Sequence, residues 1–275
     1  RRRLGRKGRN FVADLSYSTG NDERLARLTS DNIFYRSGQD STGRVRQRQQ
    51  YDNETENYGA TFSYTEPLGL QHYLELQASR QQYTNRTEKN FYDLVEVPTP
   101  GETFNPLLSN QFRRGYRYDR VGMNFMRNRK KYNFTAGAAL QNSVLDGTLA
   151  GSEETLSRRF TRVLPTLFYN YEPAMGRNFA AEYTTSLREP SLEQLQPVVD
   201  NSDPLNTYSG NPELQPEYAH NLELRLMRFD QFTMTSFFAT LGATYVSDRI
   251  TNASTVDSLF RRSIRPVNVA QDVTL

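Results

Sequence analysis

The chain contains no cysteine and no tryptophan, and it has only two histidines, His72 and His220. Without cysteine there is no disulfide framework and no thiolate metal site. The two histidines lie far apart in the sequence, so they form no histidine-rich metal motif. Gly-x-Ser-x-Gly, His-Glu-x-x-His and phosphate-binding glycine motifs are all absent. We therefore expect no enzyme, no resident metal and no cofactor.

Long apolar stretches are also missing. No run of eighteen apolar residues occurs, which excludes a transmembrane helix. Mean hydropathy is −0.77, yet the chain has 17 tyrosines and 16 phenylalanines. A soluble domain this polar would fill its core poorly. A membrane β-barrel reconciles the two numbers, because only the lipid-facing half of each strand must be apolar.

The beginning of the chain has no signal peptide, since no apolar segment follows Arg1. For an exported protein this predicts a fragment, and we expect residues 1–275 to be a single domain from the C-terminal part of a larger barrel, without a plug domain. The net charge of +3 requires no nucleic-acid partner, and none is expected.

Apolar and polar residues alternate along about ten segments. In the first, Phe11, Ala13, Leu15 and Tyr17 share one side, because successive strand side chains point to opposite faces. Strands are predicted near residues 11–18, 58–65, 72–83, 116–126, 132–141, 160–171, 179–187, 222–226, 237–245 and 267–275.

Short and long connections alternate strictly between these segments. Tight turns are predicted near residues 67, 129, 174 and 230, and long polar loops at 19–50, 97–113, 146–157, 189–216 and 247–262. This asymmetry is typical of outer-membrane barrels, which have short periplasmic turns and long extracellular loops. The fold class predicted is all-β, a transmembrane antiparallel up-and-down β-barrel. Ten strands would be part of a larger barrel, because an open edge leaves backbone groups unsatisfied in lipid.

The loop between residues 187 and 220 is punctuated by five of the twelve prolines, which cannot donate to a strand ladder. It resembles a motif of TonB-dependent outer-membrane receptors, in which Arg-x-Pro-Ser-x-x-x-Leu ends one strand and Gly-Asn-Pro-x-Leu-x-Pro-Glu begins the next. The matching residues are Arg188, Pro190, Ser191, Leu195, Gly210, Asn211, Pro212, Leu214, Pro216 and Glu217. The segments 64–69, 200–205 and 265–268 resemble the Bacteroidetes branch of this family.

The resemblance implies TonB-dependent uptake of a large, scarce ligand through a barrel of about 22 strands in the bacterial outer membrane. Siderophore, glycan and peptide ligands all stay open. The partners implied are outer-membrane lipid, the TonB system and a plug domain reached through an N-terminal part, and a surface lipoprotein. We expect the 187–220 loop to be extracellular and to capture or cover the ligand.

Several polar residues are candidates for function. Asp200 and Asp203 offer oxygen ligands for calcium, against the simpler reading of turn capping by Asx side chains. Strand parity predicts a second set on the lumen face, where they would contact a plug or line a permeation path: Glu75, Arg120, Glu182, Glu223 and Arg225. Basic residues near the short turns, including Arg129 and Arg177, suit either lipid headgroups or plain solvation.

Two other classes of function remain open from the sequence. The first is a structural or adhesive outer-membrane barrel that transports nothing. The second is a soluble β-rich binding protein, which would purify without detergent and show the same gel mobility before and after heating.

Overall fold

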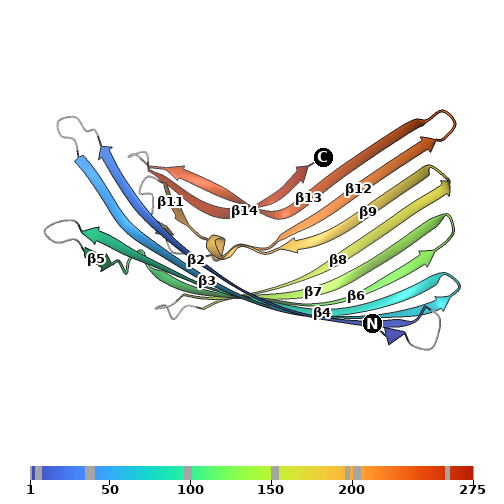
Figure 1. Cartoon of the computed structure of the whole chain (residues 1–275), viewed down its shortest axis with the longest axis horizontal. Coiled ribbons are helices and arrows are strands. Elements are labelled where there is room, and N and C mark those ends of the chain that lie inside the picture. Colours follow the sequence, from blue (N-terminus) through green and yellow to red (C-terminus); the bar gives the residue numbers. More distant parts are fainter. Residues whose placement is uncertain are drawn as a thin grey trace.

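The computed structural model describes residues 2–3, 8–34, 41–95, 101–149, 155–195, 199–200, 206–257 and 261–274. They form one large curved sheet (Figure 1). Its long strands are β2 (Asn10–Phe34), β3 (Ser41–Gly69), β4 (His72–Val95), β6 (Asn110–Asn128), β7 (Tyr132–Leu149), β8 (Thr155–Ala174), β9 (Arg177–Arg188), β12 (Glu217–Asp230), β13 (Thr235–Val256) and β14 (Arg262–Thr274). The short elements are β1 (Arg2–Arg3), β5 (Gly101–Phe104), α1 (Leu192–Leu195), β10 (Val199–Asp200) and β11 (Asn206–Ser209).

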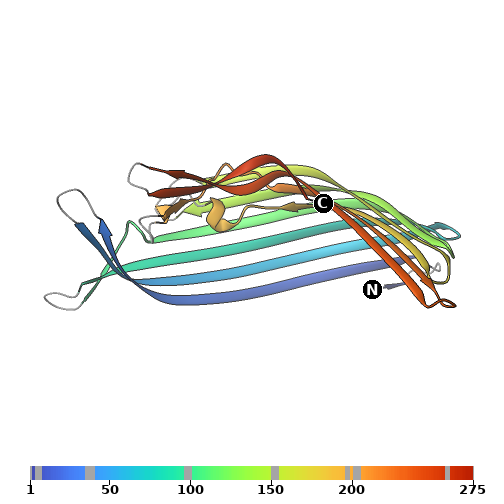
Figure 2. The same ribbon diagram turned by 90° about the horizontal axis from the view of Figure 1, so that it is seen from above.

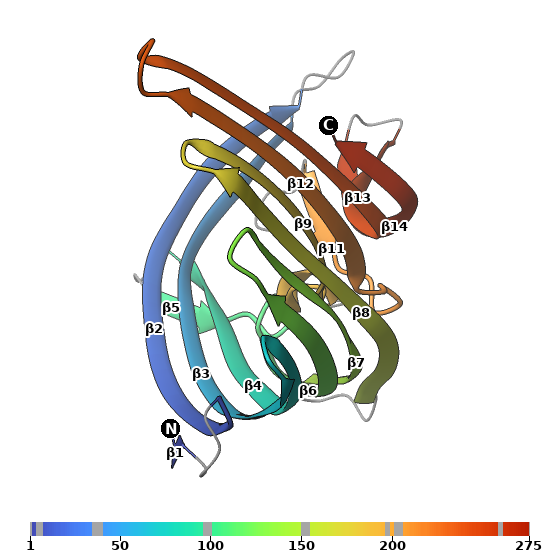
Figure 3. The same cartoon turned by 90° about the vertical axis from the view of Figure 1, so that its right-hand side faces the viewer.

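The long strands follow an up-and-down order. Each pairs antiparallel with the next long strand along the chain, and β9 pairs with β12. Figure 2 shows the strands lengthwise from above, and the view from their ends shows that the sheet curls into an arc (Figure 3). Over the described residues the order runs from β1 to β10 without closing. The chain is thus an arc of a barrel.

The two faces of the sheet differ in chemistry because directly opposite cross-strand partners share a face. The convex face presents apolar side chains to the surroundings. More than a third of the surface of each is exposed: Leu15, Phe62, Leu76, Val121, Met123, Leu140, Val163, Leu167, Leu222, Leu226, Phe237 and Leu241. The concave face is polar and hydrogen-bonded, for example from Asn124 Nδ2 to Glu75 Oε1 at 3.0 Å. An exposed apolar belt this continuous is the lipid-facing surface of a barrel.

Aromatic residues bound the apolar belt at both ends. Near the short turns, Tyr169 packs against Tyr132 and Phe179, with ring centroids 6.3 Å apart in each pair. At the other end, the Tyr17 and Tyr58 centroids lie 5.1 Å apart. The ion pair of Arg80 and Asp119, on the convex face, lies just beyond the belt at that same end. These limits fit interfacial girdles.

The prediction of a loop over residues 19–50 was wrong. Strands β2 and β3 stay paired from Asn10↔Thr65 to Phe34↔Ser41, so most of that stretch is a long hairpin beyond the apolar belt. We call its outer part, residues 18–34 and 41–57, the extension. Its residues are mostly polar on both faces, so no apolar alternation marks it in the sequence. Strands reach into the other predicted loops for the same reason, and β5 lies within 97–113.

The connections at the opposite end are short, as predicted. They occupy residues 70–71, 129–131, 175–176 and 231–234. The first turn lies after Gly69 and not near residue 67. Its second residue, Gln71, has a positive φ of 71°. The described residues hold no helix long and apolar enough to cross a membrane.

Candidate functional site

The segment between β9 and β12, residues 189–216, leaves and re-enters the sheet at one charged pair. We call it the inner segment. Arg188 and Glu217 are cross-strand partners, and Arg188 Nε lies 2.9 Å from Glu217 Oε2. Glu217 is 7% exposed, and its Oε1 also accepts the backbone N–H of Ile250 at 2.8 Å. The first and last residues of the sequence motif therefore close the base of the segment.

The inner segment then turns back over the concave face, where α1 lies in Figure 1. A reciprocal capping box starts α1: Ser191 N–H donates to Gln194 Oε1, and Gln194 N–H donates to Ser191 Oγ. From the wall, Arg114 Nη2 donates to the carbonyl of the buried Pro190 at 3.0 Å. The backbone entering α1 is thereby fixed to strand β6.

Asn211 is the polar hub of the returning half. Its backbone N–H donates to the Gln194 carbonyl at 2.6 Å, and its Nδ2 donates to the Pro266 carbonyl at 3.0 Å. Its Oδ1 accepts from Glu213 N–H and from Arg265 Nη2. A single side chain thus ties the Gly-Asn-Pro phrase to α1 and to β14, which explains an asparagine at this position.

Two leucines fix the inner segment to the barrel wall by apolar contact. Leu195 and Leu214 are each 1% exposed. They belong to one buried cluster with wall residues of the concave face, namely Tyr116, Leu145, Phe160 and Ile250. The parts of the segment around Leu195 and Leu214 are therefore packed inside the arc and do not extend away from it. β11 also pairs in parallel with β14, from Asn206↔Arg262 to Tyr208↔Ile264.

A cluster of tyrosines and arginines lies on the concave wall beside this anchor. The ring of Tyr116 is 6.0 Å from that of Tyr83 and 5.9 Å from that of Tyr118. The guanidinium of Arg120 lies 5.2 Å from the Tyr118 ring centroid and donates to Gln141 Oε1 at 2.9 Å. Burial raises the pKa of the Tyr116 hydroxyl, which lies beyond the apolar belt, so this group stays a neutral hydrogen-bonding phenol. Aromatic faces and fixed cations together suit a planar or anionic ligand.

The residues predicted for the lumen face fall into three places. Glu75 accepts from Asn124, and Arg120 belongs to the tyrosine cluster. Glu182, Glu223 and Arg225 line one cavity of about 210 Å³. Glu182 and Glu223 are cross-strand partners, and Arg225 forms an ion pair with Glu223. Contact of these residues with a plug or a ligand stays a prediction.

The structure describes little of the two loop acids, Asp200 and Asp203. Asp203 lies outside the described residues, and only the backbone of Asp200 is described, in β10. No group of three potential metal-ligating side chains occurs in the described part of the chain. The structure therefore tests neither calcium binding nor turn capping at these two acids.

The tyrosine cluster could not be predicted as a unit from the sequence. Tyr83 lies on β4, while Tyr116 and Tyr118 lie on β6, and their proximity depends on the pairing Tyr83↔Tyr116. The one available signal is their parity, which places all three on the same face as Arg120.

Comparison with known proteins now adds to this geometry. Residues 2–273 match the outer membrane protein β-barrel family. The chain belongs to that family. No curated protein sequence matches it significantly. As a member of the family, the protein is a β-barrel protein of the bacterial outer membrane, and its short turns are periplasmic.

Solved structures of TonB-dependent receptors share the fold. The copper transporter OprC superposes with a TM-score of 0.61 at 12% identity, over 96% of this chain and 40% of OprC. FpvA of P. aeruginosa, in a complex with a heterologous pyoverdine and iron, gives 0.57 at 11% identity, over 94% and 34%. The Serratia marcescens hemophore receptor HasR gives 0.57 at 14% identity, over 96% and 48%. The chain thus spans a third to a half of the length of these proteins.

Proposed function

We propose that this outer-membrane barrel is the wall of a TonB-dependent receptor, which takes up a large and scarce ligand. The observation that carries the proposal is the concave wall near the extracellular end. There the inner segment is anchored beside a cluster of three tyrosines and two arginines, Arg114 and Arg120. Such a wall offers both a binding surface and a cover for it.

The inner segment is the proposed cover. Its base is fixed by Arg188 and Glu217, while its middle is held by two leucines and one asparagine hub. A segment with fixed ends and a small apolar anchor can exchange wall contacts for ligand contacts. A siderophore, a glycan or a peptide remains open as the ligand, and the tyrosine–arginine cluster favours one with planar or anionic groups.

The proposal includes partners of the receptor class. The TonB system and a plug domain would supply gating and energy coupling, and a surface lipoprotein would deliver the ligand. The concave-face groups Glu75, Glu182, Glu223 and Arg225 would face the plug or the path of the ligand. The likeness to TonB-dependent receptors supports these roles by fold alone, because identities are 11–14%.

The test is uptake by cells that carry the protein, by cells that lack it, and by cells that carry a variant without residues 192–209. The probes are ⁵⁵Fe-loaded catecholate and hydroxamate siderophores, haem, and a fluorescent oligosaccharide, each with and without a protonophore. We expect uptake of one probe to need the protein and the proton gradient, and binding to weaken in the deletion variant. Full binding by the deletion variant would refute the role of the inner segment.

A non-transporting adhesive barrel is the second candidate. The extension favours it, since two paired strands carry polar side chains well beyond the membrane and present them to the surroundings. In that case, cells lacking the protein would take up every probe normally but would lose attachment to surfaces or to other cells. The soluble alternative is excluded by the family and its outer-membrane location.

A further inference from the structure

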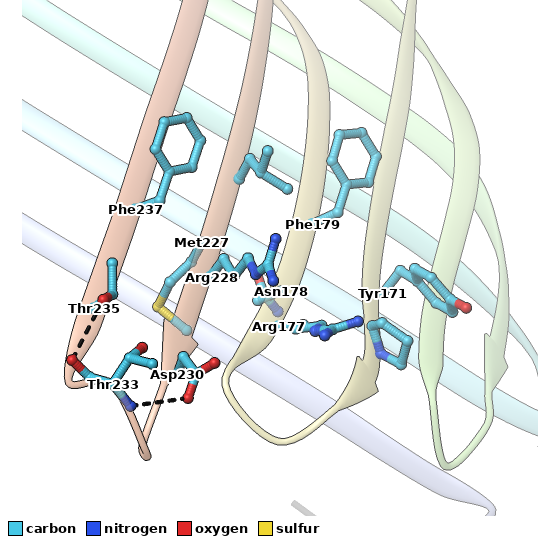
Figure 4. A pocket seen from close by; sticks show the side chains of 12 residues that line it. Tyr171, Arg177, Asn178, Phe179, Met227, Arg228, Asp230, Thr233, Thr235 and Phe237 are labelled. Carbon is cyan, nitrogen blue, oxygen red and sulfur yellow. Dashed lines mark hydrogen bonds between the residues drawn. The ribbon is translucent and has the colours of Figure 1, made fainter.

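The convex face carries a cavity at the periplasmic end that the proposed transport role does not use. It measures about 780 Å³ and lies across β8, β9, β12 and β13 (Figure 4). This volume is within the range of about 300–1,000 Å³ that small-molecule sites occupy. Its upper wall is apolar and consists of Tyr171, Phe179, Leu226 and Phe237.

Two arginines form the rim of this cavity on the side of the short turns. Arg177 and Arg228 are direct cross-strand partners on β9 and β12, and both line the cavity. Like charges placed opposite each other destabilise a sheet. Within the described parts of the chain, neither guanidinium makes an ion pair or a side-chain hydrogen bond. An anion between them would remove this repulsion.

Asp230 is the acid near the two arginines, but the turn already uses it. Its Oδ1 accepts the backbone N–H groups of Phe232 at 2.9 Å and Thr233 at 3.3 Å. These backbone bonds, more than the nearby arginines, hold the pKa of Asp230 below its usual range. The rim therefore keeps a net positive charge at neutral pH.

The position of the cavity in the membrane limits what it can hold. Tyr171 and Phe179 belong to the aromatic girdle at the periplasmic end, and the leucines and phenylalanines above them face the hydrocarbon. The arginines lie at the level of the lipid headgroups next to the turns. Figure 4 shows the side chains of Phe179 and Phe237 farther from the short turns than those of Arg177 and Asp230.

We propose that this cavity binds one anionic glycerophospholipid of the periplasmic leaflet. Its phosphate lies between Arg177 and Arg228, and an acyl chain lies against Phe179, Leu226 and Phe237. Basic residues at a membrane surface attract anionic lipid, and the apolar wall selects an acyl chain over a free anion.

The test is lipid binding by the protein purified from outer membranes in detergent and followed by native mass spectrometry. The probes are phosphatidylglycerol, phosphatidylethanolamine with the same chains, and inorganic phosphate. We expect the wild type to prefer phosphatidylglycerol. We expect Arg177→Gln and Arg228→Gln each to weaken that binding about fivefold, because one basic residue contributes on the order of 1 kcal/mol.

Arg159→Gln is the matched control, since Arg159 is an exposed arginine of β8 at the end opposite the short turns and outside the cavity. Heat-modified gel mobility verifies that each variant is a folded barrel. Unchanged phosphatidylglycerol binding in a variant that carries both Arg177→Gln and Arg228→Gln would overturn the proposal. The proposal would also be overturned if the wild type bound phosphatidylethanolamine as tightly as phosphatidylglycerol, and this measurement needs no variant. Binding of inorganic phosphate as tightly as the lipid would also overturn it, because the site would then hold a free anion.

Discussion

Glu217 shows how one residue of the motif combines two tasks. Its carboxylate binds the Arg188 guanidinium and also accepts the backbone N–H of Ile250, a residue that is only 7% exposed. Arg188 is 69% exposed, so its charge tolerates the loss of a partner. The buried N–H does not, because an unsatisfied buried donor costs about 1–3 kcal/mol.

Glu217→Ala should therefore destabilise the folded barrel by about 1–3 kcal/mol, mainly through the orphaned Ile250 N–H. Urea unfolding in detergent micelles measures the change. Glu213→Ala is the control, because Glu213 is exposed and its side chain makes no described contact. Equal unfolding of the two variants would show that the Glu217 carboxylate contributes nothing at the base of the inner segment.

At Gly176 the backbone conformation and a close neighbour both exclude a side chain. Its φ is +74°, and a Cβ added there would meet the Phe229 carbonyl oxygen at 2.4 Å. The same neighbours are bonded, since Phe229 N–H donates to the Gly176 carbonyl at 2.6 Å. The tight turn between β8 and β9 thus requires the absence of a side chain.

Gly176→Ala should cost at least about 1 kcal/mol, because alanine is strained at positive φ and would push β12 away. Gly69→Ala is the matched control: Gly69 also ends a hairpin strand, has no positive φ, and has no atom within 4 Å of an added Cβ. Thermal unfolding followed by heat-modified mobility compares the two. A Gly69 variant as unstable as the Gly176 variant would contradict this account.

At the scale of elements, the inner segment depends on a few side chains. Leu214 is fully buried against wall residues from four strands, and removing its side chain leaves a cavity that the rigid wall cannot fill. We expect Leu214→Ala to release the segment, at a cost of about 2–5 kcal/mol for that local structure.

Limited proteolysis should then cut within the inner segment while the barrel stays heat-modifiable. The control is Leu107→Ala, at an exposed leucine. Equal protease resistance in both would contradict the anchor.

The short strand β5 is held in place by an ion pair between Glu102 and Arg48. Glu102 is held by Arg48, whose Nη2 lies 2.7 Å from Glu102 Oε2, and Arg48 in turn lies 4.0 Å from the Tyr92 ring. The hydrogen bond that the Arg48 side chain donates to Glu102 lowers the pKa of the Glu102 carboxyl group. A carboxylate whose pKa is lowered by folding contributes stability above its unfolded pKa of about 4.3. That contribution is lost as the pH falls through the lower, folded value.

Amide hydrogen exchange of residues 101–104 should therefore speed up below about pH 4, after correction for intrinsic exchange rates. The Arg48→Gln variant should exchange faster already at pH 6 and show little further change with pH. A wild type whose corrected exchange stays constant between pH 6 and pH 3 would show that the ion pair does not hold β5.

The strands and the inner segment differ in how far the sequence predicts them. Strand parity was readable wherever one face meets lipid, as in residues 11–18, because alternation there is a physical requirement. It failed over the extension, where water on both faces removes that requirement. The inner segment was recognisable by its prolines. Its inward packing depends on Leu195 and Leu214 meeting Tyr116, which lies about 80 to 100 residues earlier in the chain, so these contacts leave no local signal.

At the scale of the whole molecule, the two faces of the sheet make opposite demands. Leu76 on the convex face is 47% exposed to lipid, while Gln77 next to it points to the concave side. An arginine on a lipid-facing site near the middle of the bilayer costs about 2–4 kcal/mol, whereas a water-filled interior tolerates it. Neighbouring positions should therefore respond very differently.

We expect Leu76→Arg to lower the stability of the folded barrel by about 2–4 kcal/mol and Gln77→Arg to change it by less than about 1 kcal/mol. Folding into phospholipid vesicles, titrated with denaturant, gives both values. If the two variants behaved alike, or in the reverse order, the assignment of the lipid-facing surface would be wrong.

The anchor of the inner segment also sets an order of events in folding. Its wall residues come from β6, β7, β8 and β13, so the buried site for Leu195 and Leu214 does not exist until strands from residue 116 to residue 250 are in place. Contacts this distant in sequence form late, because each needs a long loop to close first. Docking of the segment thus follows the formation of the wall from β6 to β13. A chain arrested before β13 is added would keep the segment loose and open to periplasmic proteases, so protease sensitivity of the segment would report whether the wall from β6 to β13 has formed.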